Sequence, residues 1–364
     1  STMFGMIPEY GSWRDVVSLL GLDDLSQTHS TELLKMMAEQ LTEDDEAQKP
    51  SLCAKWAPRL KSTHKSVAKL LAAVLFPEEQ HPAQSYRRLL SRINARLGTV
   101  EINMCGHDWA SIDPSAVPAR CLKVHRVAFM NQKKARSEDR VQCAVNFTQH
   151  ATSAAKDPSK ARMHGRALHP HEMAGQYMKQ QGMQEDDVIL EAQWSDMRER
   201  LREEMPLLGK MVPLVDVSGS MQGTPMEVAV ALGVLISELG MVRDRFITFS
   251  EQPSWHCMQP DWSLRQKVKS ATSAPWGGST DMQKAMELVL DACVAGEVPP
   301  EEVGELTLVV LSDMQFDDAQ RQHSFGSYGM YSHAALAWET QYECLVRRFR
   351  EAGEASKWKV GYPV

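Results

Sequence analysis

One short segment, Asp216-Val-Ser218-Gly-Ser220, constrains the fold of this chain more than any other feature. It directly follows an apolar run over residues 211–215 and precedes a helical pattern over residues 225–239, which together predict strand, loop and helix. Because open α/β sheets bind ligands at the carboxyl ends of parallel strands, we expect a ligand site at this loop. A carboxylate and two hydroxyls in one loop suit a hard divalent cation.

Two later segments supply the remaining candidate ligands. A glycine-rich turn, Trp276-Gly-Gly-Ser-Thr280-Asp281, leads into a helical pattern over residues 282–293. A second apolar run over residues 306–311 predicts another buried strand, which ends in Ser312-Asp313. The sequence therefore predicts an α/β domain in which Thr280 and Asp313 complete a metal site with the first loop.

The order Asp-x-Ser-x-Ser, then Thr in a glycine turn, then Asp at a strand end resembles the metal-ion-dependent adhesion site of von Willebrand factor type A (vWA) domains. The resemblance covers residues 211 to about 364 and implies a doubly wound, mostly parallel α/β domain. In that family the two serines contact Mg²⁺ (or Mn²⁺), the aspartates act mainly through water, and a partner carboxylate takes the open position. The implied metal ligands are Asp216, Ser218, Ser220, Thr280 and Asp313.

Other interpretations of this loop account for less of the pattern. Ser218 and Ser220 could cap a helix that starts near Gly223, but capping would leave Thr280 and Asp313 unexplained. A haloacid-dehalogenase-like phosphotransferase needs a second Asp where Ser218 stands, and Gly-x-Ser-x-Gly and phosphate-binding glycine loops are absent from the sequence. Since no general base accompanies the loop, we expect a non-catalytic binding site and no enzyme.

The N-terminal half shows helical periodicity with little β-branched alternation, so we expect an all-α region over residues 11–110. Stacked helix pairs, as in HEAT-like helical repeats, are the natural architecture for it. The four apolar stripes are Trp13, Val16, Val17 and Leu20; Leu33, Leu34, Met37 and Leu41; Val67, Leu70, Leu71, Val74 and Leu75; and Tyr86, Leu89, Leu90, Ile93 and Leu97.

Three segments ahead of the predicted sheet resemble an uncharacterised plant and fungal family (domains of unknown function 2828 and 7788): Pro8-Glu-Tyr-Gly-Ser-Trp-Arg-Asp15, Tyr86-Arg-Arg-Leu-Leu90 and Leu168-His-Pro-His-Glu172. That family is similar to the Ro ribonucleoprotein, in which a helical-repeat ring (TROVE) precedes a vWA domain. The resemblance implies RNA binding by the helical part. We expect a helical-repeat region over residues 1–182, an acidic helical linker over 183–210 and a vWA domain over 211–364, with both end regions incomplete.

Charge distribution offers independent support for RNA binding. Residues 119–171 hold eleven basic and three acidic residues, a local charge of +8 in a chain whose net charge is −7. Such a block is typical of surfaces that bind phosphate backbones, although charge runs are also commonly solvated helix faces that pair with acidic segments such as 185–204. The candidate RNA-binding residues are Lys123, Arg126, Lys133, Lys134, Arg136, Arg140, Lys160, Arg162 and Arg166.

The histidines and cysteines of the chain do not predict a further metal site. His164, His169 and His171 lack helical metal-ligand spacing, so surface or hydrogen-bonded histidines are expected. The seven cysteines are scattered without a Cys-x-x-Cys pair, which favours free thiols in a reducing intracellular compartment, cytoplasmic or nuclear. No apolar run reaches eighteen residues, and the N-terminus does not read as a signal peptide, so no membrane association is expected.

Two functional hypotheses follow from the sequence. In the first, the chain is a scaffold whose helical half binds structured RNA while the metal site recruits a protein that offers a carboxylate. In the second, it is purely a protein-interaction adaptor that works through its metal site.

Overall fold

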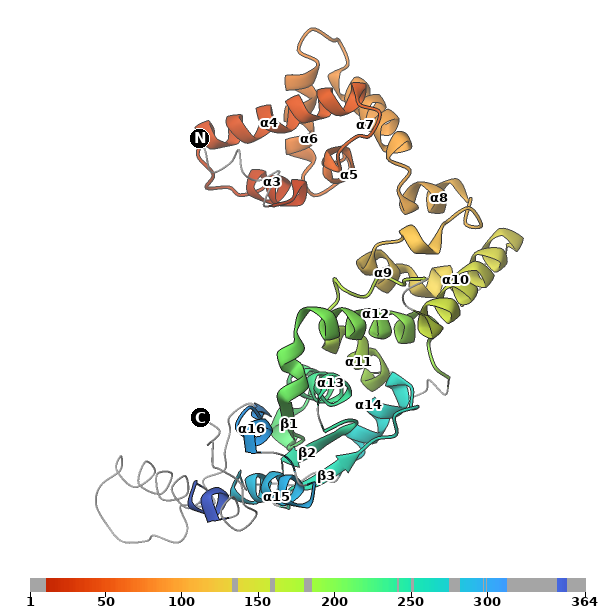
Figure 1. Cartoon of the computed structure of the whole chain (residues 1–364). Helices are drawn as coiled ribbons and strands as arrows, with labels where there is room; N and C mark the ends of the chain where they lie inside the picture. The colour runs from red at the N-terminus through yellow and green to blue at the C-terminus, as the bar shows by residue number, and fades with distance from the viewer. Residues whose placement is uncertain are drawn as a thin grey trace. The chain divides into compact units, whose positions relative to one another are not determined.

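The computed structural model describes residues 11–132, 137–157, 161–179, 185–240, 242–249, 252–274, 282–296, 298, 300–312 and 346–351 (Figure 1). The chain forms two compact units, Ser1–Ile112 and Asp113–Val364. Each unit has its own hydrophobic core. In the described residues of the first unit all regular secondary structure is helical, and the second unit contains a mostly parallel sheet, so the expected combination of a helical region and an α/β region is confirmed.

Local signals define the helix ends of the first unit. The Asp15 carboxylate accepts a hydrogen bond from the Ser12 N–H at the start of its first described helix. Pro82 occupies the first turn of a later helix, which Gly98 ends in the left-handed conformation (φ +56°). The helices are α3 (Trp13–Leu20), α4 (Gln27–Glu46), α5 (Cys53–Trp56), α6 (Lys65–Leu75), α7 (Pro82–Leu97) and α8 (Val100–Gly106).

The predicted apolar stripes form most of the core of the first unit. Leu33, Met37 and Leu41 of α4 are fully buried. Tyr86 of α7 is also fully buried and donates a hydrogen bond from its hydroxyl to the Pro58 carbonyl at 3.0 Å, which satisfies its polar end. In α6 the stripe divides: one side packs into the core, whereas two of its predicted members are about half exposed, Leu70 at 51% and Val74 at 48%.

A four-stranded sheet forms the centre of the second unit. Its strands are β1 (Met211–Asp216), β2 (Arg245–Phe249), β3 (Ser254–Cys257) and β4 (Thr307–Leu311), in the order β3-β2-β1-β4. β1 pairs in parallel with β2 and β4, and β3 pairs antiparallel with β2. Both strands that the sequence predicted, over residues 211–215 and 306–311, are therefore present and are direct neighbours.

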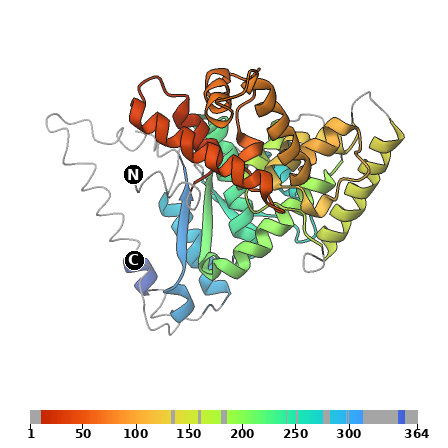
Figure 2. The ribbon, with the colours of Figure 1, turned by 90° about the horizontal axis from the view of Figure 1, so that it is seen from above.

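Helices cover both faces of this sheet (Figures 1 and 2). Alternate side chains of β1 point to opposite faces. Val215 packs with α11–α14, whereas Val212 and Leu214 pack with α15. The helices of this unit are α9 (Ala119–Phe129), α10 (Glu138–Lys156), α11 (Pro170–Lys179), α12 (Val188–Glu204), α13 (Thr224–Leu239), α14 (Leu264–Thr272), α15 (Met282–Ala295) and α16 (Pro300–Val303), with short 3₁₀ turns at Pro114–Ala116, Pro206–Lys210 and Gly219–Met221.

α13 is apolar on nearly all sides because it lies between the sheet and α11. Gly233 permits this close packing, since a Cβ at that position would lie 2.4 Å from Cγ2 of Val215 in β1. The helix that positions the candidate loop is thus held from two directions.

The division between the units differs from the predicted domain boundaries. Residues 113–210 belong to the same compact unit as the sheet, and α12 buries both apolar side chains, such as Ile189 and Trp194, and the polar Gln193. This helix is part of the core of the second unit and not the linker that its acidic composition indicated. Among its acidic residues, Asp196 pairs with Arg166 from outside the helix, whereas Glu199 and Glu204 pair with Arg202 and Arg200 of α12 itself.

Cys53, Cys105, Cys121, Cys143, Cys257 and Cys293 form no disulfide in the described part of the chain. Within the described part of the chain, every helix is too short or too polar to cross a membrane.

Candidate functional site

Asp216 ends β1 and is the buried centre of the candidate site, with 2% of its surface exposed. Its Oδ1 accepts a hydrogen bond from the Ser218 N–H at 2.8 Å. Its Oδ2 accepts one from the hydroxyl of Ser312, the residue that follows β4, at 2.6 Å. Both carboxylate oxygens are therefore engaged from within the protein, which fixes the orientation of a charge that would otherwise be costly to bury.

Ser218 and Ser220, in the loop that follows this carboxylate, bring their hydroxyls together. Their Oγ atoms lie 3.0 Å apart, with Ser218 half-buried and Ser220 exposed. Neither hydroxyl caps α13: its N-cap is Gly223, which has a positive φ of +95° and makes no side-chain cap. The capping interpretation of these serines is therefore wrong, because the chain passes through a 3₁₀ turn and Gly223 before the helix starts.

Asp216 and Ser312 lie at a position in the sheet that favours ligand binding. After β1, the chain adds β2 on one side of it and later β4 on the other, so the strand order reverses between β1 and β4. Asp216 and Ser312 lie at the carboxyl ends of these two strands. In open α/β sheets this crevice is where ligands bind.

The donor set fits a small hard cation. One buried carboxylate and two accessible hydroxyls are oxygen donors of the kind that Mg²⁺ accepts together with retained waters. Among the described residues there is no group of three or more His, Cys, Asp or Glu that could hold a metal, so any cation here would depend on the serines. The other two predicted ligands, Thr280 and Asp313, lie outside the described residues.

Most described candidates for RNA binding are engaged inside the second unit. Lys123 forms an ion pair with Glu172 at 2.5 Å. Arg126 is 5% exposed and pairs with Asp187 at 3.1 Å, so it has no surface to offer a phosphate. Arg166 pairs with Asp196, and Arg140 donates to the Ala128 carbonyl.

The remaining candidates of that block divide into two groups. Arg162 is exposed, whereas Lys133, Lys134, Arg136 and Lys160 lie outside the described residues. The neighbouring histidines have protein partners, as expected: His164 contacts the Ser115 carbonyl, and the rings of His169 and His171 stack at 5.6 Å.

Two features were missed at the sequence level. Ser312 was visible only as a serine after a predicted strand.

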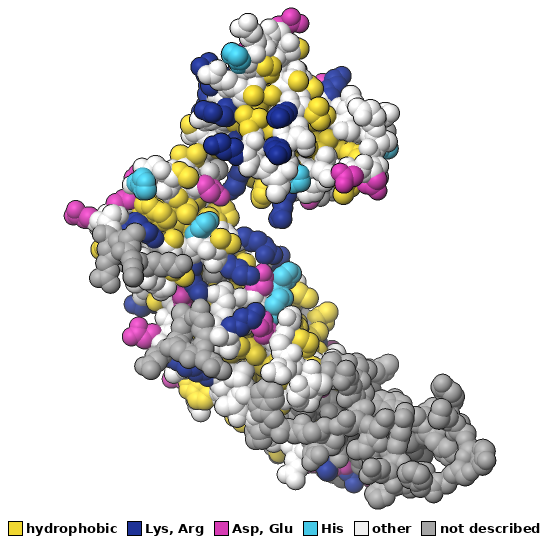
Figure 3. All heavy atoms as spheres, turned by 180° about the vertical axis from the view of Figure 1, so that it is seen from behind, with side chains coloured by type: hydrophobic (Ala, Val, Ile, Leu, Met, Phe, Trp, Pro, Cys, Tyr) yellow, Lys and Arg dark blue, Asp and Glu magenta, His cyan; other side chains and the backbone are white. Residues whose placement is uncertain are grey.

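A second basic region was visible in the charge count, because residues 51–98 hold nine basic and two acidic residues, a local charge of +7. Of its exposed cations, Arg92 and Arg96 pair with Asp45, whereas five others form no ion pair with any residue that the structure describes. Figure 3 shows basic side chains gathered over one face of the first unit. We call the exposed Lys61, Lys65, Lys69, Arg87 and Arg88 the α6–α7 basic face.

Comparisons with known proteins give the family of the chain. Residues 24–207, just over half of the chain, match the "Domain of unknown function (DUF2828)", and residues 210–356 match the "Domain of unknown function (DUF7788)". The "Uncharacterized protein L728" of Acanthamoeba polyphaga mimivirus is 29% identical over 97% of this chain, which spans 62% of the length of that relative. No solved structure matches the chain. The chain therefore belongs to the family defined by DUF2828, with a DUF7788 region following in the same polypeptide.

Proposed function

We propose that the second unit binds a partner through a divalent cation held at the Asp216 loop, and that this site is a vWA-type adhesion site without catalytic activity. The single observation that carries the proposal is the juxtaposition of the buried Asp216 carboxylate with the Ser218 and Ser220 hydroxyls at the reversal point of the strand order. Hydrogen bonds hold the Asp216 carboxylate in a fixed position, while the two hydroxyls remain accessible from solvent.

In this proposal Ser218 and Ser220 hold Mg²⁺ or Mn²⁺, and Asp216 supplies compensating negative charge. Thr280 and Asp313 are the further ligands that the sequence pattern adds. A bound cation supplies a Lewis-acidic position at which a carboxylate from a protein partner displaces a water. Because serine hydroxyls are neutral, the protein neutralises the cation incompletely, which favours an anionic ligand from outside.

The test is a titration of the full chain with Mn²⁺, in which electron paramagnetic resonance measures the concentration of free Mn²⁺. We expect one Mn²⁺ bound per chain, and loss of that binding in Ser218→Ala/Ser220→Ala. Ser153→Ala, a change at an exposed serine of α10, is the matched control and should bind as the wild type does. Equal Mn²⁺ binding by the wild type and the double variant would refute the proposal.

A carboxylate ligand is tested in the same preparation by water-proton relaxation. Bound Mn²⁺ that keeps an exchangeable water enhances this relaxation, and we expect added glutamate to reduce the enhancement. If the enhancement does not respond to glutamate while Mn²⁺ stays bound, the cation is structural and the adhesion role fails.

RNA binding by the helical part is a second candidate function, and the α6–α7 basic face is the observation that favours it. α6 packs against α7, and the five exposed cations of this face have no acidic partner among the described residues. Phosphate backbones bind such surfaces with a strong dependence on salt. Arg126 is buried and does not contribute to this surface.

The test is the affinity of the full chain for a labelled RNA hairpin over a salt series. Replacing Lys65, Lys69, Arg87 and Arg88 by Gln should reduce the slope of log affinity against log salt by about 3, at about 0.7–0.9 per lost phosphate contact. Lys35→Gln, at an exposed lysine of α4, is the matched control. No measurable RNA binding at low salt would leave the metal-dependent adaptor as the function.

A further inference from the structure

The second unit contains a cavity of about 440 Å³ between the sheet and α15, a volume in the range of small-molecule sites. It is separate from the candidate metal site. Val212 in its wall stands four residues before Asp216 in β1, so the two regions are about 13 Å apart along the strand. The cavity therefore lies toward the amino ends of the parallel strands, opposite the serine loop.

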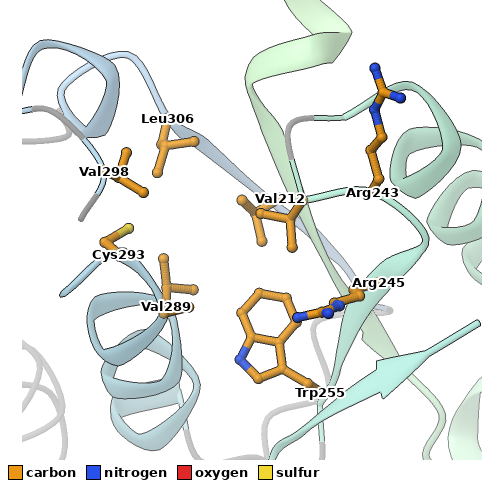
Figure 4. Close-up of a pocket in the computed structure, with 10 residues that line it drawn as sticks. Val212, Arg243, Arg245, Trp255, Val289, Cys293, Val298 and Leu306 are labelled. Atoms are coloured by element: carbon orange, nitrogen blue, oxygen red, sulfur yellow. The ribbon is translucent and has the colours of Figure 1, made fainter. Parts of the chain in front are cut away.

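Apolar side chains from three directions form most of the wall (Figure 4). Val212 and Trp255 come from the sheet, Val289 and Cys293 from α15, and Leu306 from the segment before β4. Burial raises the pKa of the Cys293 thiol, so this wall stays uncharged near neutral pH. The described lining residues include no Asp or Glu.

One charged group faces this apolar space. Arg245, the first residue of β2, extends toward the Trp255 indole, whereas the guanidinium of Arg243 points away from the cavity (Figure 4). Arg245 is exposed and forms no ion pair with another described residue. An apolar cavity with one unpaired guanidinium at its edge has the composition of a site for an amphiphilic anion, because each part of such a ligand meets matching chemistry.

We propose that this cavity binds a monocarboxylate that carries an apolar chain, with the chain against Val289 and Trp255 and the carboxylate on Arg245. A planar guanidinium pairs with a carboxylate through two parallel hydrogen bonds. A single arginine matches one negative charge, which favours a monocarboxylate over a polyphosphate. The site binds without metal and adds a small-molecule ligand to the proposed partner binding.

The test is calorimetric titration of the full chain with decanoate, below its micelle concentration and in EDTA so that the metal site does not contribute. We expect one decanoate per chain and an affinity about tenfold higher than for 1-decanol, the uncharged analogue, which corresponds to one charge-assisted contact at a partly exposed site. Arg245→Gln should lower decanoate affinity by about tenfold and leave decanol affinity unchanged. Arg243→Gln removes the same charge two residues away and should have no effect.

Filling the cavity supplies the complementary variant. Ala292→Phe on α15 should abolish binding of both ligands. Val298→Phe, at a half-buried position outside the helices, is the second filling variant if Ala292→Phe does not fold. The proposal is overturned if decanoate does not bind, if decanoate and decanol bind equally well, if Arg243→Gln and Arg245→Gln have the same effect, or if a folded filling variant binds decanoate normally.

Discussion

Lys267 of α14 is the charged side chain whose removal should be most costly to the second unit. It is 2% exposed, and its Nζ donates to Glu238 at 2.8 Å and to Asp244 at 2.7 Å. Lys267→Met keeps the volume of the side chain and removes its charge. Glu238 would remain buried with a hydrogen bond from Trp194 Nε1 at 2.8 Å and an ion pair with Arg198 at 3.6 Å.

The expected loss follows from what each carboxylate retains. Removing one partner of a buried ion pair costs about 3–5 kcal/mol. Because Glu238 keeps two partners and the Asp244 side chain is 14% exposed, we expect the lower end, about 3 kcal/mol. The double variant Lys267→Met/Glu238→Gln also removes the buried charge of Glu238, so part of the stability lost in Lys267→Met should be recovered.

Hydrogen exchange of amides in α13 and α14, measured in the full chain, isolates the second unit from the first. A loss of 3 kcal/mol accelerates exchange through global opening by about a hundredfold. Lys269→Met, at an exposed position of the same helix, is the control and should change stability by less than about 0.5 kcal/mol. If the amides of α13 and α14 exchange in Lys267→Met at rates within threefold of the wild type, Lys267 is not buried between the two carboxylates and the reasoning fails.

Two further predictions concern the packing of α11 and α12. Burial works against ionisation of Glu172, but hydrogen bonds from Lys123 and the His169 N–H outweigh it and lower the pKa of Glu172 from 4.5 to about 2. Ionised Glu172 therefore stabilises the protein above pH 4.5, and this contribution is lost as the pH falls toward 2. The unfolding temperature of Glu172→Gln should depend less on pH across that window than that of the wild type. Identical pH profiles of the two proteins would contradict the assignment. A Cβ on Gly165 would lie 2.0 Å from the Gln193 carbonyl oxygen, so Gly165→Ala should cost about 1–3 kcal/mol in urea unfolding. Gly106→Ala, which meets nothing within 4 Å, should be neutral, and equal effects of the two substitutions would refute the close approach.

Much of the candidate site could be predicted from residues close together in the chain. The strand, loop and helix around Asp216 follow from an apolar run, a Ser/Gly segment and a helical period, all of which act locally. Parallel strands place their carboxyl ends at one edge of a sheet, and the pairing of β1 with β4 is what brings the end of β4 beside Asp216. The hydrogen bond from Ser312 to Asp216 brings the end of β4 to the Asp216 loop, whereas the predicted ligand Asp313 lies outside the described residues.

The sequence by itself determined the helical character of the first unit, two strands of the sheet and the serine loop, because hydrophobic periodicity and turn residues specify local structure. Only the tertiary structure decided which charges remain available to a partner. Arg126 and Lys123 belong to a basic block yet pair with Asp187 and Glu172, whereas the α6–α7 basic face has no such partners among the described residues. Pairing depends on segments that meet across the fold, and burial of an ion strongly favours a partner of opposite charge, so net charge along the chain does not locate a binding surface. The burial of α12 has the same origin: Asp196 pairs with the distant Arg166, and the apolar residues of the helix complete a core that composition alone does not reveal.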